Sequence, residues 1–320
     1  MICIRSYSND PFFNLAAEEY LMKNSEETFY FQYINHDSVV VGKHQNALAE
    51  VDLSYLHDNE ILLARRISGG GAVYHDRGNL NYSFLSNEKQ GDFIQFRKYT
   101  APIIEVLAEL TIEAKLGERN EILVGDKKIS GTASHVYKNR VLHHGTLLFD
   151  AQLERLARCL YVSQDRFDDK AVRSIRSEVI NIRSLLEEPI SMEEFSDYIF
   201  TAILNSNTGN TQEELDEKSV EEIEKLRTER FSTWDWNYGY SPKYQVKNTV
   251  DYFGSPVQFT TLVVKGMIAR LEIEGDPGMD AHRLDHLLIG RKHDKPHIHK
   301  ILKEDGIDFN ILIRILQGIF

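Results

Sequence analysis

Residues 65–76 read Arg-Arg-Ile-Ser-Gly-Gly-Gly-Ala-Val-Tyr-His-Asp, and a short strand is predicted over residues 61–65. Three consecutive glycines permit tight turns and let backbone N–H groups approach a ligand closely. Arg66 beside them offers a planar cation that suits a phosphate or a carboxylate. The spacing is not that of a Walker loop, because no Gly-x4-Gly-Lys-Ser/Thr occurs. It is not a full dinucleotide fingerprint either, because Tyr74 stands where the third glycine should be. For the glycine triplet alone, a flexible loop between strands is the simpler interpretation.

Strands and helices are predicted on both sides of this loop. Asn9-Asp10-Pro11 is a typical helix start. Strands are predicted over 29–33, 38–41, 82–85, 121–124, 127–130 and 142–149, with a helix over 102–116 and helical patterns over 153–226. Residues 212–229 are acidic and are predicted to form a solvated helix or connector. Strands over 246–253, 257–264 and 267–273 and two helical stretches follow. This order predicts an α+β fold with a mixed or antiparallel sheet.

Length and composition limit the class of protein. The 320 residues suggest two domains, and we predict a boundary near residues 235–243 that divides the chain into domains 1–240 and 241–320. Lys and Arg number 37 against 49 Asp and Glu, and the net charge of −12 argues against a general nucleic-acid binder. No apolar run reaches the roughly 18 residues of a membrane span, and no signal peptide is expected. With only Cys3 and Cys159, a reducing, cytoplasmic location is expected.

A second cluster lies at residues 120–133, Asn-Glu-Ile-Leu-Val-Gly-Asp-Lys-Lys-Ile-Ser-Gly-Thr-Ala. A hairpin is predicted here with its turn at Gly125-Asp126. A lysine next to this tip can neutralise a bound anion as a point charge. Taken by itself, the segment is more simply a solvated turn.

The third cluster is His143-His144-Gly145-Thr146-Leu147-Leu148. Adjacent residues on a strand point to opposite faces, so the two histidines do not easily bind one metal ion. The chain also lacks the His-Glu-x-x-His and Cys-x-x-Cys spacings of zinc sites. The spacing indicates no Ser-His-Asp arrangement, and both cysteines lie outside the three clusters.

Taken together and in this order, the clusters resemble those of the lipoate–protein ligases, in the biotin/lipoate ligase superfamily. The matching segments are 11–19, 40–46, 65–79, 125–131, 143–148 and 174–177. The resemblance is strong over about residues 6–185. It is weaker at residues 234–239 and the strands after them, which resemble the family's small C-terminal accessory domain.

The resemblance implies a mixed sheet flanked by helices, as in class II synthetase and biotin ligase catalytic domains, with a small α+β C-terminal domain. It implies that lipoate reacts with ATP, with magnesium, to give lipoyl-AMP. The lipoyl group then passes to a lysine of an apo lipoyl domain, either glycine-cleavage H protein or a 2-oxoacid dehydrogenase E2 subunit. A monomer is expected, with no nucleic-acid or membrane partner.

The resemblance also assigns residues to the reaction. Lys128 matches the catalytic lysine, between the lipoate carboxyl group and the α-phosphate. The residues expected to bind ATP are Arg66, Gly71, Ala72, Val73, Tyr74, Asn120 and Lys128. Those expected to bind lipoate are Ser68, Gly69, Gly70, His75, Lys128, His144 and Gly145. Asp126 is a candidate magnesium ligand, and His75 and His144 are expected to shape the pocket instead of acting as acid or base.

Two alternatives to a ligase remain open. An octanoyl or lipoyl transferase of the same superfamily would work without ATP, and several of those enzymes use a thiol nucleophile. A catalytically inactive relative would only bind lipoyl domains or repress a gene. Biotin ligation is disfavoured because the loop lacks a Gly-Arg-Gly-Arg type of sequence.

Overall fold

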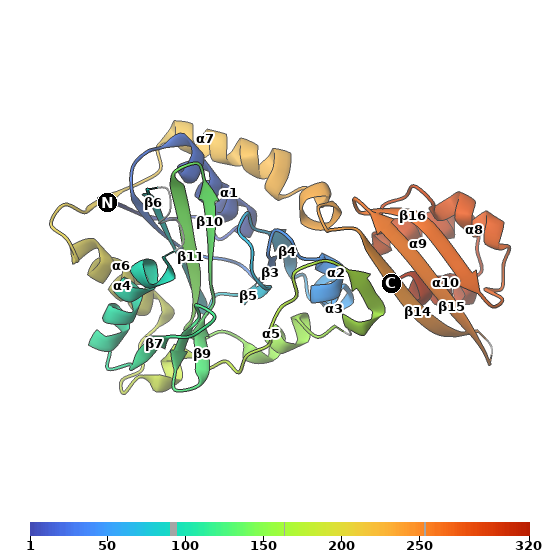
Figure 1. Ribbon diagram of the computed structural model, residues 1–320, viewed down its shortest axis with the longest axis horizontal. Coiled ribbons are helices and arrows are strands. Elements are labelled where there is room, and N and C mark those ends of the chain that lie inside the picture. The colour runs from blue at the N-terminus through green and yellow to red at the C-terminus, as the bar shows by residue number, and fades with distance from the viewer. Residues whose placement is uncertain (90–94, 163, 253) are drawn as a thin grey trace. The chain divides into compact units, whose positions relative to one another are not determined.

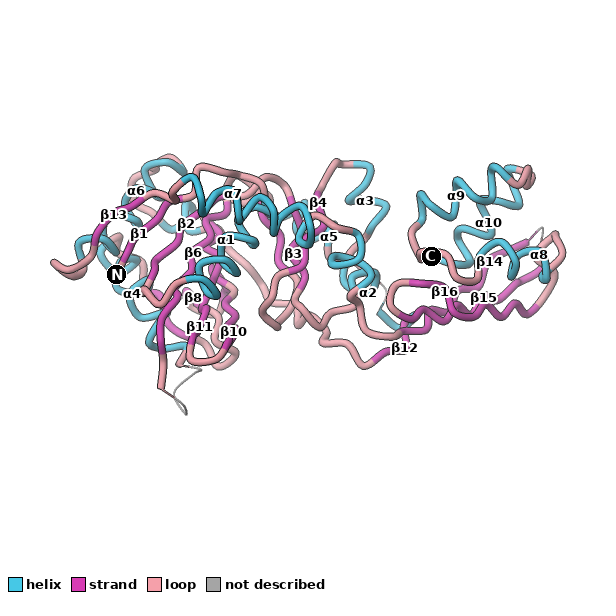
Figure 2. Tube along the Cα trace, turned by 90° about the horizontal axis from the view of Figure 1, so that it is seen from above, coloured by secondary structure: helices cyan, strands magenta, loops and turns pink. Residues whose placement is uncertain are grey.

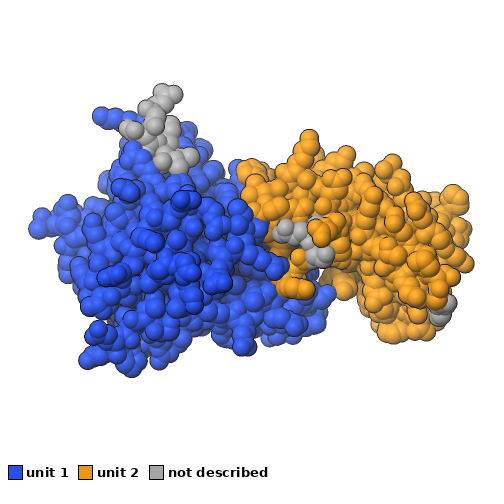
Figure 3. Space-filling model, turned by 60° about the horizontal axis from the view of Figure 1, so that its bottom comes forward, with its two compact units in different colours: residues 1–43, 51–160, 174–233 blue, residues 44–50, 161–173, 234–320 orange. Residues whose placement is uncertain are grey.

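The computed structural model describes residues 1–89, 95–162, 164–252 and 254–320. The chain forms two compact units, shown in different colours in Figure 3. Unit 1 contains residues 1–43, 51–160 and 174–233, and unit 2 contains residues 44–50, 161–173 and 234–320. The predicted domain boundary after residue 240 therefore falls within unit 2, and the division into catalytic and accessory domains stays a prediction.

A six-stranded mixed sheet forms the body of unit 1, in the order β10-β11-β6-β2-β1-β13. Its strands, in that order, are Thr132–Tyr137, Arg140–Leu148, Asn79–Asn87, Phe29–Ile34, Ile2–Arg5 and Thr211–Glu213. β1 is parallel to both β2 and β13, whereas the pairs β2/β6, β6/β11 and β11/β10 are antiparallel. Figure 1 shows β10 and β11 as a long hairpin along this sheet.

Helices cover both faces of this sheet. Side chains of α4 (Phe96–Glu109) and α6 (Met192–Asn205) pack into the core on one face. On the other face α1 (Pro11–Asn24) contacts β2, β6 and β11, and α7 (Glu217–Leu226) packs against α1. Successive side chains of β2 point to opposite faces of the sheet and so contact different helices. Gln32 donates a hydrogen bond to Ser196 of α6, whereas Tyr33 donates one to Glu18 of α1.

Two three-stranded sheets complete unit 1 and carry the motifs. One has the order β4-β3-β5, from Leu62–Arg65, Ser38–Val41 and Val73–His75. The other is antiparallel, β7-β8-β9, from Ala114–Leu116, Ile122–Val124 and Lys127–Ser130. Shorter helices are α3 (Leu53–Asp58), α5 (Leu153–Cys159), η2 (Ile182–Leu185) and η3 (Arg227–Phe231).

Unit 2 is an antiparallel sheet with helices on it, in the order β12-β14-β15-β16. The strands are Phe167–Asp169, Tyr244–Tyr252, Ser255–Val264 and Met267–Glu274. Helix α10 (Phe309–Ile319) packs on β14 and β15, and α8 (Ala281–Leu288) and α9 (Lys295–Glu304) complete the core (Figure 2). The unit also contains α2 (Ala47–Glu50), η1 (Gln164–Arg166) and η4 (Asp235–Gly239).

The mixed α+β architecture is the predicted fold class, but three local predictions are wrong. The helix predicted over residues 102–116 begins at Phe96 and ends at Glu109, because Thr111 adopts a left-handed φ of 61° and residues 114–116 form β7. The helical region predicted over 153–226 is interrupted by extended chain at residues 170–181. Three helices, not two, follow β16. Of the strand predicted over 246–253, Phe253 lies outside the described residues.

None of the helices in the described part of the chain has the length and apolar character that a membrane crossing requires. The predicted start of α1 is confirmed. The carboxylate of Asp10 accepts a hydrogen bond from the N–H of Phe12, and Pro11 occupies the first turn. The predicted hairpin is also confirmed, with Gly125 at a φ of 62° between β8 and β9.

Candidate functional site

The glycine loop between β4 and β5 is held by two neighbouring arginines. Arg65 is fully buried and donates to the carbonyls of Gly42 and Lys43. Arg66 is 5 % exposed and donates to the carbonyls of Val40 (3.0 Å), Gly69 (2.6 Å) and Gly71 (2.8 Å). Burial lowers the pKa of Arg66 to about 10, which leaves it charged at neutral pH. The loop is therefore wrapped around a buried cation.

The loop also depends on Gly42, the residue after β3. A Cβ atom at Gly42 would lie 2.2 Å from the carbonyl oxygen of Gly70. Nearby, the N–H of Lys43 donates to the carbonyl of Ser68 at 2.8 Å. The two backbones approach so closely that no side chain fits between them.

We therefore expect Gly42→Ala to displace the loop by about 1 Å and to reduce kcat/KM by about a hundredfold. Unfolding should become easier by about 1–3 kcal/mol, as for other overpacked sites. Turnover of the reaction that the resemblance implies and urea denaturation measure the two effects. Gly209→Ala is the matched control, because its Cβ would meet only the Asn207 side chain, at 3.4 Å. Wild-type kcat/KM in Gly42→Ala would show that the loop tolerates the displacement.

Ser174 closes the loop from the opposite side. Its hydroxyl oxygen accepts a hydrogen bond from the N–H of Ala72 at 2.8 Å. Further along the same extended segment, the carbonyl of Glu178 accepts from the N–H of Lys128 at 2.9 Å. Residues 174–178 thus connect the glycine loop with the strand that carries Lys128.

Lys128 lies on β9, and its side chain lies against Gly131 on the side where Val73, at the end of the glycine loop, also approaches. Its ammonium nitrogen is 3.2 Å from the point where a Cβ atom on Gly131 would stand, and Val73 lies 3.7 Å from the same point. Burial lowers the pKa of Lys128, Glu121 opposes this effect, and the charges of Arg119 and Arg66 add to it. A partly desolvated ammonium group is therefore placed where it could pair with an anion.

Asn120 and Asp126, the other two candidates near Lys128 in the chain, differ in their surroundings. Asn120 has a left-handed φ of 64° at the turn before β8, and its carbonyl accepts from the Thr132 hydroxyl. Asp126 is exposed at the tip of the β8–β9 hairpin. Within the described ranges, no three His, Cys, Asp or Glu side chains gather as a metal ion would require. Asp126 alone does not form a resident metal site.

His144 belongs to a buried chain of hydrogen bonds under the loop. Ser68 accepts from Arg66 Nε at 2.9 Å and bonds to His144 Nε2 at 2.6 Å. His144 Nδ1 lies 3.0 Å from Oε2 of the Glu18 carboxylate. The other oxygen of this carboxylate, Oε1, accepts hydrogen bonds from the hydroxyls of Tyr33 and Ser83. Ser68, His144 and Glu18 are therefore linked side chain to side chain, an arrangement that their positions in the chain did not reveal.

The predicted site residues Tyr74, His75 and Gly145 lie on strands, where the side chains of successive residues point to opposite faces. The Tyr74 side chain faces Asp37, Asp76 and Arg155, on the opposite side of β5 from His75. Gly145 lies opposite Tyr82 in the β11–β6 pairing, and a Cβ there would be 2.5 Å from the Tyr82 hydroxyl. Only the backbone of Tyr74 is therefore oriented to take part in the site.

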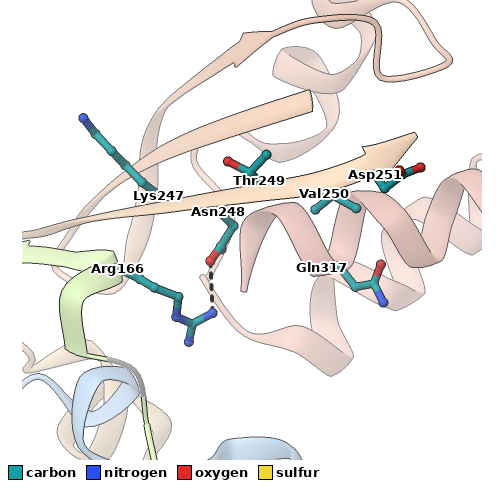
Figure 4. Close-up of a pocket in the computed structure, with 7 residues that line it drawn as sticks. All are labelled: Arg166, Lys247, Asn248, Thr249, Val250, Asp251 and Gln317. Carbon is teal, nitrogen blue, oxygen red and sulfur yellow. Dashed lines mark hydrogen bonds between the residues drawn. The ribbon is translucent and has the colours of Figure 1, made fainter. Parts of the chain in front are cut away.

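A hollow on the surface of unit 2 contains none of the predicted site residues. It has a volume of about 500 Å³ and is lined by Arg166, residues 247–251 and Gln317 (Figure 4). Lys247 points away from the others, and Arg166 donates to the Asn248 side chain at 3.0 Å. Its polar groups do not converge on a common point.

Sequence reasoning missed Asn14, Glu18, Asn35 and Ser174 as members of the site. Asn14 and Glu18 are fully buried on α1, one helical turn apart, and Asn35 is fully buried in the turn after β2. A signal was present for α1, since Asn and Glu at this spacing stand on the apolar stretch of a helix. Asn35 and Ser174 contact His75 and Ala72, which are distant in the chain, so no spacing pattern in the sequence marks these two residues.

Comparison with known proteins places the chain among lipoate-protein ligases. Residues 10–204 match the family model of the lipoyl protein ligase A/B catalytic domain. The lipoate-protein ligase LplJ of Bacillus subtilis is 40% identical over 301 residues, which cover 92% of this chain and 91% of the relative. Lipoate–protein ligase 1 of Staphylococcus aureus is 40% identical over 319 residues, 96% of this chain and 97% of the relative.

Solved structures with the same fold include ligand complexes. P. falciparum LipL1 in complex with lipoate is 26% identical with a TM-score of 0.64, over 98% of both chains. A lipoate-protein ligase A bound with ATP is 26% identical with a TM-score of 0.63, over 75% of this chain and 98% of that one. The bipartite ligase of Thermoplasma acidophilum, described with its E2 lipoyl domain, is 27% identical with a TM-score of 0.63, over 75% of this chain and 96% of that one.

Proposed function

Because this chain belongs to the lipoyl protein ligase A/B catalytic-domain family and is a lipoate–protein ligase, we propose that it works in two steps through lipoyl-AMP. In the first step, a carboxylate oxygen of lipoate attacks the α-phosphorus of ATP and pyrophosphate leaves. In the second step, the ε-amine of an acceptor lysine attacks the acyl carbon. The amide forms, AMP leaves, and the amine gives up its proton.

The observation that carries this proposal is the ammonium group of Lys128 beside the glycine loop. Carboxylate and phosphate repel each other, and a cation between them lowers the cost of bringing them within attack distance. The same charge stabilises the phosphorus centre as negative charge builds up on it. The lowered pKa of Lys128 reflects a desolvated position, in which this charge acts more strongly than in water.

The glycine loop supplies the other contacts in this proposal. Backbone groups of Gly71, Ala72, Val73 and Tyr74 line the nucleotide together with Asn120, and Arg66 adds positive charge near the phosphates. Ser68, Gly69, Gly70, His144 and Gly145 surround the acyl chain. Because Arg66 donates to the loop carbonyls of Gly69 and Gly71 and to the β3 carbonyl of Val40, its contribution here is to order the loop and set the potential.

Magnesium enters this proposal with ATP, as part of the substrate. It commonly binds through one or two carboxylates together with substrate phosphates. Asp126 could supply one such ligand, although its exposed position does not form a site by itself. The acceptors proposed are apo lipoyl domains of E2 subunits and H protein, and the T. acidophilum ligase, described with its E2 lipoyl domain, supports the first.

The thiol-dependent transferase is disfavoured by the two cysteines. Cys3 and Cys159 are both fully buried, and burial raises the pKa of each thiol to about 11. A buried, protonated thiol is a poor nucleophile. An acyl transfer that passes through a cysteine thioester would therefore lack its nucleophile in this chain.

The proposal is tested by pyrophosphate exchange and by mass spectrometry of acceptors. Purified protein should exchange labelled pyrophosphate into ATP only when lipoate is present. With apo E2 lipoyl domains and apo H protein as acceptors, ATP and lipoate should together add the mass of one lipoyl group. If lipoyl transfer from a lipoylated carrier proceeded without ATP, and no exchange occurred, the transferase would replace the ligase.

A further inference from the structure

A chain of hydroxyl and amide groups runs from the N-terminal segment to His75. Asn14 Nδ2 donates to the carbonyl of Ser8 at 3.0 Å, and this carbonyl can only accept. The Asn14 amide therefore has one orientation, in which its Oδ1 accepts from the Ser6 hydroxyl at 2.6 Å. The second hydrogen of Asn14 Nδ2 is then directed at Asn35.

The same logic determines the proton on His75. Asn14 Nδ2 donates to Asn35 Oδ1 at 2.8 Å, so the NH₂ end of Asn35 faces His75. Asn35 Nδ2 lies 2.9 Å from His75 Nδ1, which must act as the acceptor. A neutral imidazole with an acceptor Nδ1 carries its proton on Nε2. The chain thus selects one tautomer of His75.

This Nε2–H group is a donor without an acceptor. His75 is 3 % exposed, and its Nε2 atom has no hydrogen-bond partner among the residues that the structure describes. Burial, Arg66 and His144 together lower the pKa of His75 to about 3, so the ring stays neutral at physiological pH. A buried donor left unpaired is costly, and binding a ligand acceptor would remove that cost.

The other site histidine has the opposite tautomer. The Ser68 oxygen accepts from Arg66, so its proton is free to reach His144 Nε2, and His144 Nδ1–H then donates to Glu18. Asn14 and Glu18 lie one turn apart on α1, so one face of this helix orients both histidines. The groups that act on His75 are Arg66, after β4, and His144, on β11, with Glu18 behind His144.

We propose that His75 Nε2–H is the hydrogen-bond donor to a carboxylate oxygen of the acyl substrate, and that Asn35 is the positioning residue that keeps this donor in place. The inference rests on the proposed ligase function. The oxygen that it holds is the one that does not attack ATP and becomes the carbonyl oxygen of lipoyl-AMP. A neutral donor holds it without neutralising the nucleophilic carboxylate, and stabilises the charge on that oxygen when the amine attacks.

The first test is Asn35→Asp, which keeps the size and the acceptor for Asn14. The carboxylate introduced by this substitution would accept from His75 Nδ1, so the neutral ring would lose its Nε2 proton. Above neutral pH we expect the KM for lipoate to rise about tenfold or more. Toward lower pH the ring should gain a second proton, and KM should recover. Wild-type KM across pH 6–9 in Asn35→Asp would overturn the inference.

Two replacements of His75 keep the inference testable if Asn35→Asp does not fold. His75→Gln can place an N–H close to the Nε2 position, and its KM for lipoate should stay within about threefold of wild type. His75→Asn cannot reach that position, and its KM should rise about tenfold. Equal KM values for the two variants would contradict the donor role. His143→Asn is the matched control, since His143 is also fully buried but packs against Phe96 and Tyr99.

Nitrogen-15 NMR of histidine gives a readout that does not require activity. Without substrate, His75 should show a protonated Nε2 and a bare Nδ1, and octanoate should shift its Nε2–H proton downfield. If octanoate binds and this signal does not move, the inference is wrong even where exchange activity is normal. Absence of lipoate-dependent exchange in the wild type would instead count against the ligase function, while the NMR result would still decide the role of His75.

Discussion

Lys128→Ala should reduce lipoate-dependent exchange of pyrophosphate into ATP by about a thousandfold or more, while the protein remains folded. The ammonium group beside the glycine loop is the cation proposed to hold carboxylate and phosphate together. Loss of one such group from a desolvated site typically costs two to three orders of magnitude, and loss of positioning adds to this. Single-turnover formation of lipoyl-AMP measures the effect directly.

Stability separates this role from a structural one. Burial lowers the pKa of Lys128, which means that keeping this ammonium charged is unfavourable for the folded protein. Its removal should leave the free energy of unfolding within about 1 kcal/mol of wild type. Lys127→Ala is the matched control, because Lys127 is the exposed neighbour on the same strand. Adenylation at the wild-type rate in Lys128→Ala would refute the assignment.

Mild acid should destabilise the protein strongly through three buried histidines. Burial lowers the pKa of His75 and His143 to about 3 and that of His293 to about 4. In the unfolded chain each titrates near 6.5, so below that pH the unfolded state binds protons that the folded state does not. Stability is therefore complete above about pH 6.5 and falls as the pH decreases. By pH 5 the loss should be about 2 kcal/mol for each histidine.

Unit 1, which contains His75 and His143, should therefore lose about 4 kcal/mol, and unit 2, which contains His293, about 2 kcal/mol. The first loss is a large part of the stability of a typical domain. Urea denaturation between pH 7 and pH 5 should show this loss. His143→Gln should reduce the slope of unfolding free energy against pH by about 1.4 kcal/mol per unit. A pH-independent unfolding free energy over this range would show that the buried rings accept protons.

Local elements were well predicted because local chemistry specifies them. Asp10 and Pro11 begin α1, and Gly125 makes the turn between β8 and β9, through residues adjacent in the chain. The start of α4 was wrong because Pro102, which usually occupies a first turn, lies inside the helix. The extended segment at residues 170–181 was mistaken for helix, since part of it is set by contacts with the distant Lys128 and Ala72.

The amino-acid sequence by itself determined the fold class, the order of the three motifs and the family to which the chain belongs. The ordered set of motifs, with the glycine triplet and the lysine pair among them, was enough to identify the family, because each motif is a contiguous stretch of the chain. Tertiary structure decided the hydrogen-bond partners of the two site histidines, His75 and His144. His144 meets Glu18 from 126 positions away, and Asn35 meets His75 from 40. Packing of α1 on the sheet brings Glu18 to His144, and pairing of β3 with β5 brings His75 next to the turn that contains Asn35. The tautomer of His75 follows from hydrogen bonds that no local pattern encodes.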